Sequence, residues 1–132
     1  MDYTVHVLEK IAERYGQRKA LWGIGVLNEP MCCDTPNGAM MNIENLMSFY
    51  QPVDQELAKQ NANYTLSFLR QFYREAYAAI RRHTNKKVVF CDAFELDIWD
   101  DFLEDFENVV LDTHNYLMAP DLTLFKERNA QV

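Results

Sequence analysis

The amino-acid sequence predicts an α/β fold made of parallel βα units. Three short apolar runs, at 21–27, 87–91 and 108–114, have the length and composition of strands buried on both faces of a parallel sheet. Helical periodicity precedes the first run and separates it from the second. Because helices alternate with strands, we expect parallel pairing through right-handed crossovers, in a small doubly wound domain or in part of a (β/α)8 barrel.

Two long helices and one short helix are expected around these strands. Apolar residues recur at helical spacing over 3–15 and again over 62–84, and Gly16 follows the first segment as a C-terminal cap. A short helix is expected near 99–106. The segment 31–60 contains proline and glycine and keeps no period, so we expect a long loop, part of which could be helical.

Composition and charge narrow the class of protein. The chain has 132 residues, of which 48% are apolar and 25% charged, as is typical of one globular domain. Its formal net charge of −7 argues against a nucleic-acid partner, because binding a polyanion needs a basic surface. The basic cluster within 81–87 lies at the expected end of the second helix, where cations complement the helix dipole.

The cysteines predict neither a disulfide framework nor a metal site. Cys32, Cys33 and Cys91 show no CxxC or paired-histidine spacing, so we interpret them as buried or idle thiols, with a bridge from Cys91 to one of the pair as the minor alternative. No signal peptide, lipidation motif or long apolar run is present, and no membrane contact is expected. Localisation stays open, since an excised segment of a secreted parent protein would also lack a signal peptide.

Each expected strand is followed, at its carboxyl end, by polar or aromatic residues. Ligands bind at this end of the strands in both doubly wound sheets and barrels. Three consecutive strands contribute here, which fits a barrel mouth better than a single crevice. The residues are Asn28 and Glu29 after the first strand, Asp92 and Phe94 after the second, and His114 and Tyr116 after the third.

The first of these ends carries a specific motif. The segment 21–30, which ends in Asn28-Glu29-Pro30, resembles the fourth barrel strand of glycoside hydrolase family 5, whose Asn-Glu-Pro motif holds the general acid/base. Gly25 stands where a glutamate is common in that strand, and the motif itself is intact.

Two further segments extend the resemblance in the same order. His114-Asn115-Tyr116 is similar to the His-x-Tyr motif on the sixth strand of the family. The segment 90–94 resembles the end of the fifth strand. Its Asp-Ala-Phe, followed by Trp99 and Phe102-Leu103, is similar to the exo-β-1,3-glucanase-like branch. The resemblance therefore implies that residues 1–132 are a partial catalytic domain, about strands 4 to 6 of a TIM barrel with flanking helices.

The resemblance implies a hydrolase acting on O-glycosyl bonds of β-glucan-type polysaccharides by a retaining double displacement, with no cofactor and no metal. Glu29 would give its proton to the departing glycosidic oxygen and later take one from water. Burial at the end of an apolar strand would favour its protonated form. Asn28 can donate an amide hydrogen to a sugar 2-hydroxyl. A neutral oligo- or polysaccharide substrate would be compatible with the negative charge of the chain.

Four other residues are expected to bind the sugar. His114 and Tyr116 are two apart on a strand and share one face, so both can hydrogen-bond the substrate and orient the carboxylates. Phe94 and Trp99 could stack on pyranose rings. Each has a structural alternative: a core histidine, a packing tyrosine, two core aromatic rings and, for Glu29, a loop carboxylate.

A second carboxylate is missing. Retaining hydrolysis needs a nucleophile about 5–5.5 Å from the acid/base, and the family takes it from a glutamate ending the seventh strand. No residue here matches that motif, since Glu127 lies in the helix expected after the sixth strand. We expect the nucleophile outside this chain, the chain alone to be inactive, and self-association through its two open sheet edges.

Three alternatives remain at this point. The chain could be a non-catalytic carbohydrate-binding or assembly fragment of a barrel. It could be a small doubly wound domain for an anionic ligand, although no strand is followed by a Gly-rich loop. Finally, Glu29 could form an inverting site with Asp112 or Asp92, which would require a carboxyl separation of about 6.5–9.5 Å.

Overall fold

The computed structural model describes residues 2–36, 53–57 and 64–114. The first elements are helix α1 (Asp2–Tyr15) and strand β1 (Gly23–Gly25), followed by helix α5 (Leu66–Arg81). Strand β2 (Lys87–Cys91) comes next, and then the 3-10 turn η1 (Leu96–Ile98), the short helix α6 (Asp100–Leu103) and strand β3 (Val109–Asp112). Among the described helices, none has the length and apolarity needed to cross a membrane.

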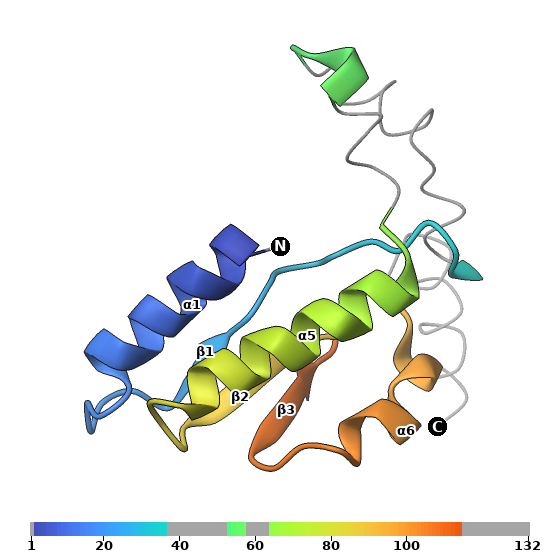
Figure 1. The fold of residues 1–132 in the computed structure, drawn as a ribbon. Helices are drawn as coiled ribbons and strands as arrows, with labels where there is room; N and C mark the ends of the chain where they lie inside the picture. The colour runs from blue at the N-terminus through green and yellow to red at the C-terminus, as the bar shows by residue number, and fades with distance from the viewer. Residues whose placement is uncertain (1, 37–52, 58–63, 115–132) are drawn as a thin grey trace, which may run out of the picture.

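The described strands form one parallel sheet in the order β1-β2-β3 (Figure 1). Ile24 pairs with Val88 and Val88 with Val109, so the three strands start in one row. The prediction of parallel βα units is confirmed: the fold is a small α/β fold with a three-stranded open parallel sheet and flanking helices.

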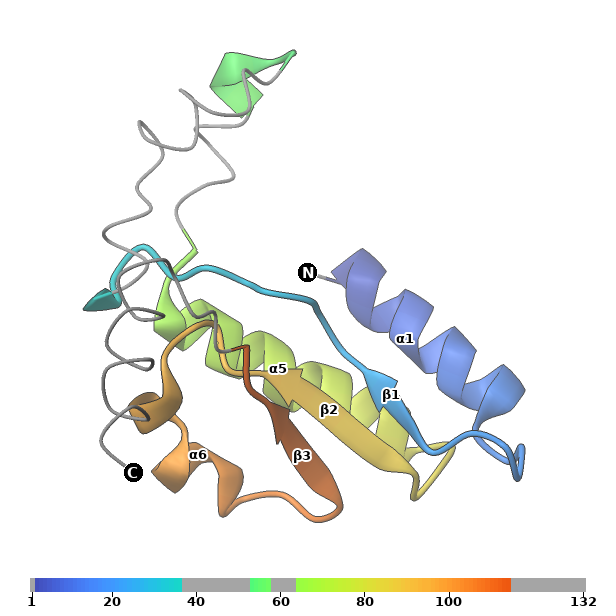
Figure 2. The same cartoon turned by 180° about the vertical axis from the view of Figure 1, so that it is seen from behind.

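One face of the sheet carries the helices and the core. Residues of a strand alternate between faces, and Ile24, Val88 and Phe90 point to the face where α5 packs. The ring of Phe90 stacks on Tyr73 of α5 with centroids 4.5 Å apart, and α1 packs against α5 along the β1 side. Figure 2 shows the strands in front of α5. Because α5 covers this face, a ligand can reach the sheet only on the other face or at the strand ends.

The face opposite α5 is lined by the alternate residues. Gly25, Val89 and Val110 form one row across the three strands. Val89 and Val110 are half-buried, and a Cβ added to Gly25 would meet no atom within 4 Å. Asp112 and His114 continue the same alternation at the carboxyl end of β3, and Glu29, beyond the end of β1, contacts His114 there. Among the described residues, this face therefore has free space beside its strands.

Backbone contacts at the amino end of the sheet hold α1 and α5 in place. The N–H of Gly16 donates to the carbonyl of Ala12, and a Cβ at Gly16 would lie 2.4 Å from that oxygen, so only glycine fits there. The hydroxyl of Thr84 donates to the carbonyl of Gly16 (2.8 Å). The Arg81 guanidinium donates to the carbonyls of Lys86 (2.7 Å) and Asn108 (3.0 Å), which joins the end of α5 to the starts of β2 and β3.

At the carboxyl end, the segment after Glu29 is attached to the start of α5. The N–H of Cys33 donates to the carbonyl of Tyr64 (2.7 Å), and the Asp34 carboxylate accepts from the N–H of Leu66 (2.7 Å). The Thr65 hydroxyl caps the helix by accepting from the N–H of Phe68. These contacts fix where the chain goes after it passes Glu29.

The observed elements are shorter than the periodicity predicts. The run 21–27 forms a strand only from Gly23 to Gly25, although hydrogen bonds from Lys87 N to Trp22 O and from Val26 N to Val89 O continue the pairing. Trp22 is 65% exposed and Leu27 is 43% exposed because β1 has one partner strand in the described sheet. Most of the loop expected over 31–60 lies outside the described residues.

The Tyr73 hydroxyl provides a test of this core. It is fully buried and donates to the carbonyl of Cys91 at 2.9 Å, and burial raises its pKa. We expect Tyr73→Phe to lower the free energy of unfolding by about 1–2 kcal/mol, since it leaves a buried carbonyl without its donor. Tyr3→Phe, at a ring that is 81% exposed, should change nothing measurable. Urea unfolding of both variants measures this, and equal effects would contradict the packing described.

Candidate active site

Glu29 and His114 meet at the carboxyl end of the sheet. Glu29 follows β1, and His114 follows β3, 85 positions further along the chain. The Glu29 Oε1 and His114 Nδ1 atoms are 2.7 Å apart, a hydrogen bond of charge-assisted length. Because β2 lies between β1 and β3, this contact passes over the end of the central strand. The two side chains remain 30% and 20% exposed, so solvent or a ligand can reach them.

Asp112 adds a second carboxylate to the same imidazole. Its Oδ2 lies 3.3 Å from the Nε2 of His114. The two residues are two apart at the end of β3 and therefore share one face. The hydrogen bond to Glu29 raises the pKa of His114, and the one to Asp112 raises it further. The protonated imidazole, which carries an N–H toward each carboxylate, is thus the favoured form.

The backbone at Glu29 has an unusual conformation. Its φ is 46°, in the left-handed region that residues other than glycine rarely adopt, and Pro30 follows it. The thiol of Cys91, at the end of β2, lies against the backbone N–H groups of Glu29 and Ala93, and burial raises the pKa of Cys91. Backbone of this kind is enriched at active and ligand-binding sites, although Asn108, at the start of β3, adopts it as well.

The chain after β2 makes a tight turn of the same character. Ala93 and Phe94 both have positive φ, 55° and 62°. The buried carboxylate of Asp92 accepts from the N–H of Phe94 at 3.0 Å and so holds the turn. The backbone N–H of Asp92 donates to the carbonyl of Asp112. Asp92 is thus committed to the turn, which weighs against it as the second carboxylate of an inverting site.

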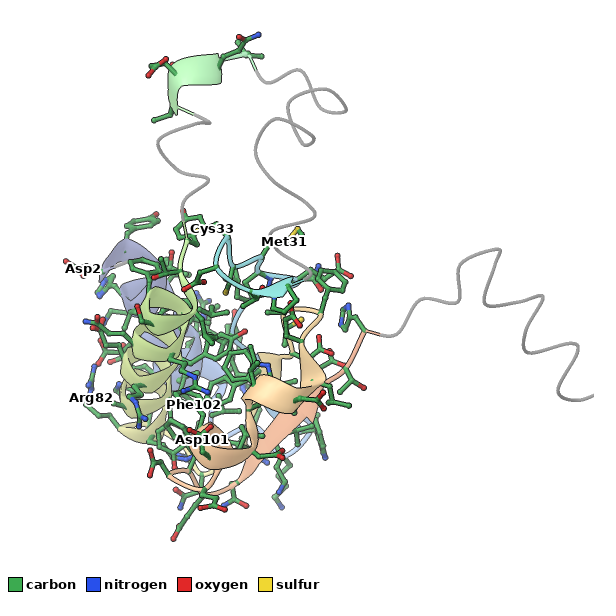
Figure 3. All side chains as sticks on the ribbon, turned by 90° about the vertical axis from the view of Figure 1, so that its right-hand side faces the viewer. Asp2, Met31, Cys33, Arg82, Asp101 and Phe102 are labelled. Atoms are coloured by element: carbon green, nitrogen blue, oxygen red, sulfur yellow. The ribbon has the colours of Figure 1, made fainter. Side chains whose placement is uncertain are left out.

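The remaining predicted binding residues differ in position. Asn28 is exposed beside Glu29, and Phe94 is half-buried at the end of β2, so both lie at the carboxyl end of the sheet. Tyr116 lies outside the described residues. Figure 3 labels Met31, two residues after Glu29, above Phe102 and Asp101 in that view.

Trp99 has another role than the one expected. Its ring is fully buried and packs against Tyr73 and Phe102, each at a centroid distance of 5.5 Å. Its indole N–H donates to the carbonyl of Asp92 at 2.7 Å. A ring without accessible surface cannot stack on a sugar, so we assign Trp99 to the core, where it supports the Asp92 turn. Trp99 is therefore a core aromatic ring, which was the alternative to a sugar-stacking role.

The described residues offer no metal centre. Within 2–36, 53–57 and 64–114, no three His, Cys, Asp or Glu side chains are grouped to hold an ion. All three cysteines are free, Cys32 and Cys91 buried and Cys33 exposed, so the alternative of a bridge to Cys91 is wrong.

The contact between Asp112 and His114 was not predicted from the sequence. The signal was nevertheless present, because Asp-x-His on a strand places both side chains on one face. Comparison with known proteins adds no relative: no protein-family model matches the chain, and no curated protein matches it. The function is therefore inferred from the positions of Glu29, Asp112 and His114.

The raised pKa of His114 predicts a pH-dependent stability. Protonation of His114 stabilises the folded state fully below the ordinary value of about 6.5, and that stabilisation is lost as the pH rises through the higher folded value. Glu29→Gln removes the largest cause of the shift. We expect the urea midpoint of the wild type to exceed that of Glu29→Gln at pH about 5.5, and the difference to shrink at pH about 8.5.

The matched control is Glu104→Gln, an exposed carboxylate at the end of α6. Its effect on the midpoint should not follow the protonation of His114. A difference between wild type and Glu29→Gln that stays constant or grows with pH would contradict the contact.

Proposed function

We propose that this chain is a segment of a (β/α)8-barrel glycosidase of the family 5 type, which hydrolyses β-glucan-type polysaccharides with retention. The observation that carries the proposal is the 2.7 Å contact between Glu29 and His114. The Asn-Glu-Pro and His-x-Tyr motifs were found separately in the sequence, and their charged residues meet at the carboxyl end of one parallel sheet, where barrel enzymes bind substrates.

The topology supports the same proposal. Strands consecutive in the chain are neighbours in the sheet, and α5 crosses from β1 to β2 on the face opposite Gly25, Val89 and Val110. In a barrel, helices cover the outer face, and inward residues end at the substrate site. Asp112 and His114 continue the alternation of this face, and Glu29 reaches it through its contact with His114. The half-buried valines would then pack against further strands of the parent barrel.

Glu29 is the acid/base in this proposal. Its carboxyl would protonate the departing glycosidic oxygen, and its carboxylate would later accept a proton from water. Asn28, exposed beside it, would donate to the sugar 2-hydroxyl, and Phe94 and Tyr116 would contact the sugar rings. The nucleophile would come from outside this chain, and no step requires a cofactor. The edges of β1 and β3 would pair with further strands or with a second copy.

Sugar binding by the purified chain tests the proposal. We expect β-1,3- or β-1,4-linked glucose oligosaccharides to shift the amide NMR signals around Asn28, Phe94 and His114. Asn28→Ala should weaken the affinity roughly fivefold, the value of one hydrogen bond to a neutral partner. Asn85→Ala, exposed in the turn before β2 at the other end of the sheet, should leave it unchanged.

Two outcomes would contradict parts of the proposal. Failure of both oligosaccharides to bind, with the chain folded, would remove the sugar site. Hydrolysis of β-glucan by the purified chain, abolished in Glu29→Gln, would show that the nucleophile lies within it. A catalytic parent also differs from a non-catalytic binding or assembly fragment in its reading frame, which must encode a further strand ending in glutamate.

A further inference from the structure

The imidazole of His114 faces a carboxylate at each nitrogen. Nδ1 is 2.7 Å from Glu29 Oε1, and Nε2 is 3.3 Å from Asp112 Oδ2. A neutral imidazole has one N–H and can donate to only one of two ionised carboxylates, whereas an imidazolium can donate to both. While both carboxylates are ionised, the arrangement of the three side chains therefore favours a histidine with two N–H groups.

The two carboxylates are not equivalent. Glu29 is the closer partner and follows β1, the strand at the other edge of the sheet from β3. Asp112 is 57% exposed, lies on the same strand as His114, and makes the longer contact. Asp112 also reaches His114 on the nitrogen that points away from Glu29. Its hydrogen bond therefore affects Glu29 through the imidazole that lies between them.

We propose that Asp112 is a positioning residue: its carboxylate accepts the Nε2–H of His114 and keeps the imidazole doubly protonated, with the Nδ1–H directed at Glu29. The Glu29 carboxylate then has a charged donor beside it whenever it has released its proton. The proton can also cross within the contact, from Nδ1–H⁺ to Oε1, which leaves a neutral imidazole with its Nε2–H and a neutral Glu29 carboxyl.

This role connects the pH range of the site to Asp112, which contacts the other nitrogen of His114. Within the part of the chain that the structure describes, β2 brings two further titratable groups to this end of the sheet: the buried thiol of Cys91 lies against the backbone of Glu29, and the buried carboxylate of Asp92 holds its own turn. The charge of Asp112 thus sets the pH at which His114 loses its second proton. The consequence for sugar chemistry rests on the proposed function, but the protonation of His114 does not.

NMR titration of His114 in the full chain tests this role. We expect the midpoint to fall in Asp112→Asn, in which the side-chain oxygen can still accept the Nε2–H but the charge is gone. A purely structural role would leave that midpoint unmoved. Asp112→Glu should restore it toward the wild-type value, and Glu29→Gln should lower it more than Asp112→Asn does. Amide spectra of each variant show whether it is folded.

A second measurement separates this inference from the proposed function. Oligosaccharide affinity is measured against pH in the wild type and in Asp112→Asn, and the pH at which affinity changes should move downward with the His114 midpoint. A wild-type midpoint kept in Asp112→Asn overturns the role of Asp112, whether or not the sugar binds. Absence of sugar binding with the expected shift in midpoint keeps that role and rejects the glycosidase.

Discussion

One hydrogen bond, between the Glu29 carboxyl and the His114 imidazole, joins the ends of two strands that are not neighbours in the sheet. It forms only if β1, β2 and β3 are parallel, in this order and in this register. A slip of one residue in β3 would turn Asp112 and His114 to the face that α5 occupies. The packing of Phe90 on Tyr73, which fixes the faces of β2, is therefore also a condition for the site.

The backbone after β1 and β2 has an unusual conformation that accompanies the contact between Glu29 and His114. Glu29, Ala93 and Phe94 all have left-handed backbone, although none is glycine. The buried ring of Trp99 and the carboxylate of Asp92 stabilise the turn after β2, and that turn lies against the thiol of Cys91 beneath Glu29. The aromatic core thus supports the site indirectly: it holds the turn against which the acid/base residue is positioned.

The sequence predicted the parallel βα units and placed Glu29 and His114 at the carboxyl ends of their strands, because periodicity and motif position depend on local rules. It overestimated β1, since Trp22 and Leu27 are apolar yet lie beside an edge. It placed Trp99 at the sugar, because the residue type alone does not tell whether an aromatic ring after a strand points into the core or to the surface. The left-handed φ of Glu29 has no signal in its residue type.

The claim that Glu29 and His114 belong to one site is tested most directly by the contact itself. Nuclear Overhauser spectra of the chain at a pH where His114 is protonated would measure the proximity of its ring protons to the side-chain protons of Glu29. We expect clear cross-peaks between the His114 ring protons and the Glu29 side-chain protons. Cross-peaks from the His114 ring to other residues only, in a chain whose sheet is intact, would contradict it.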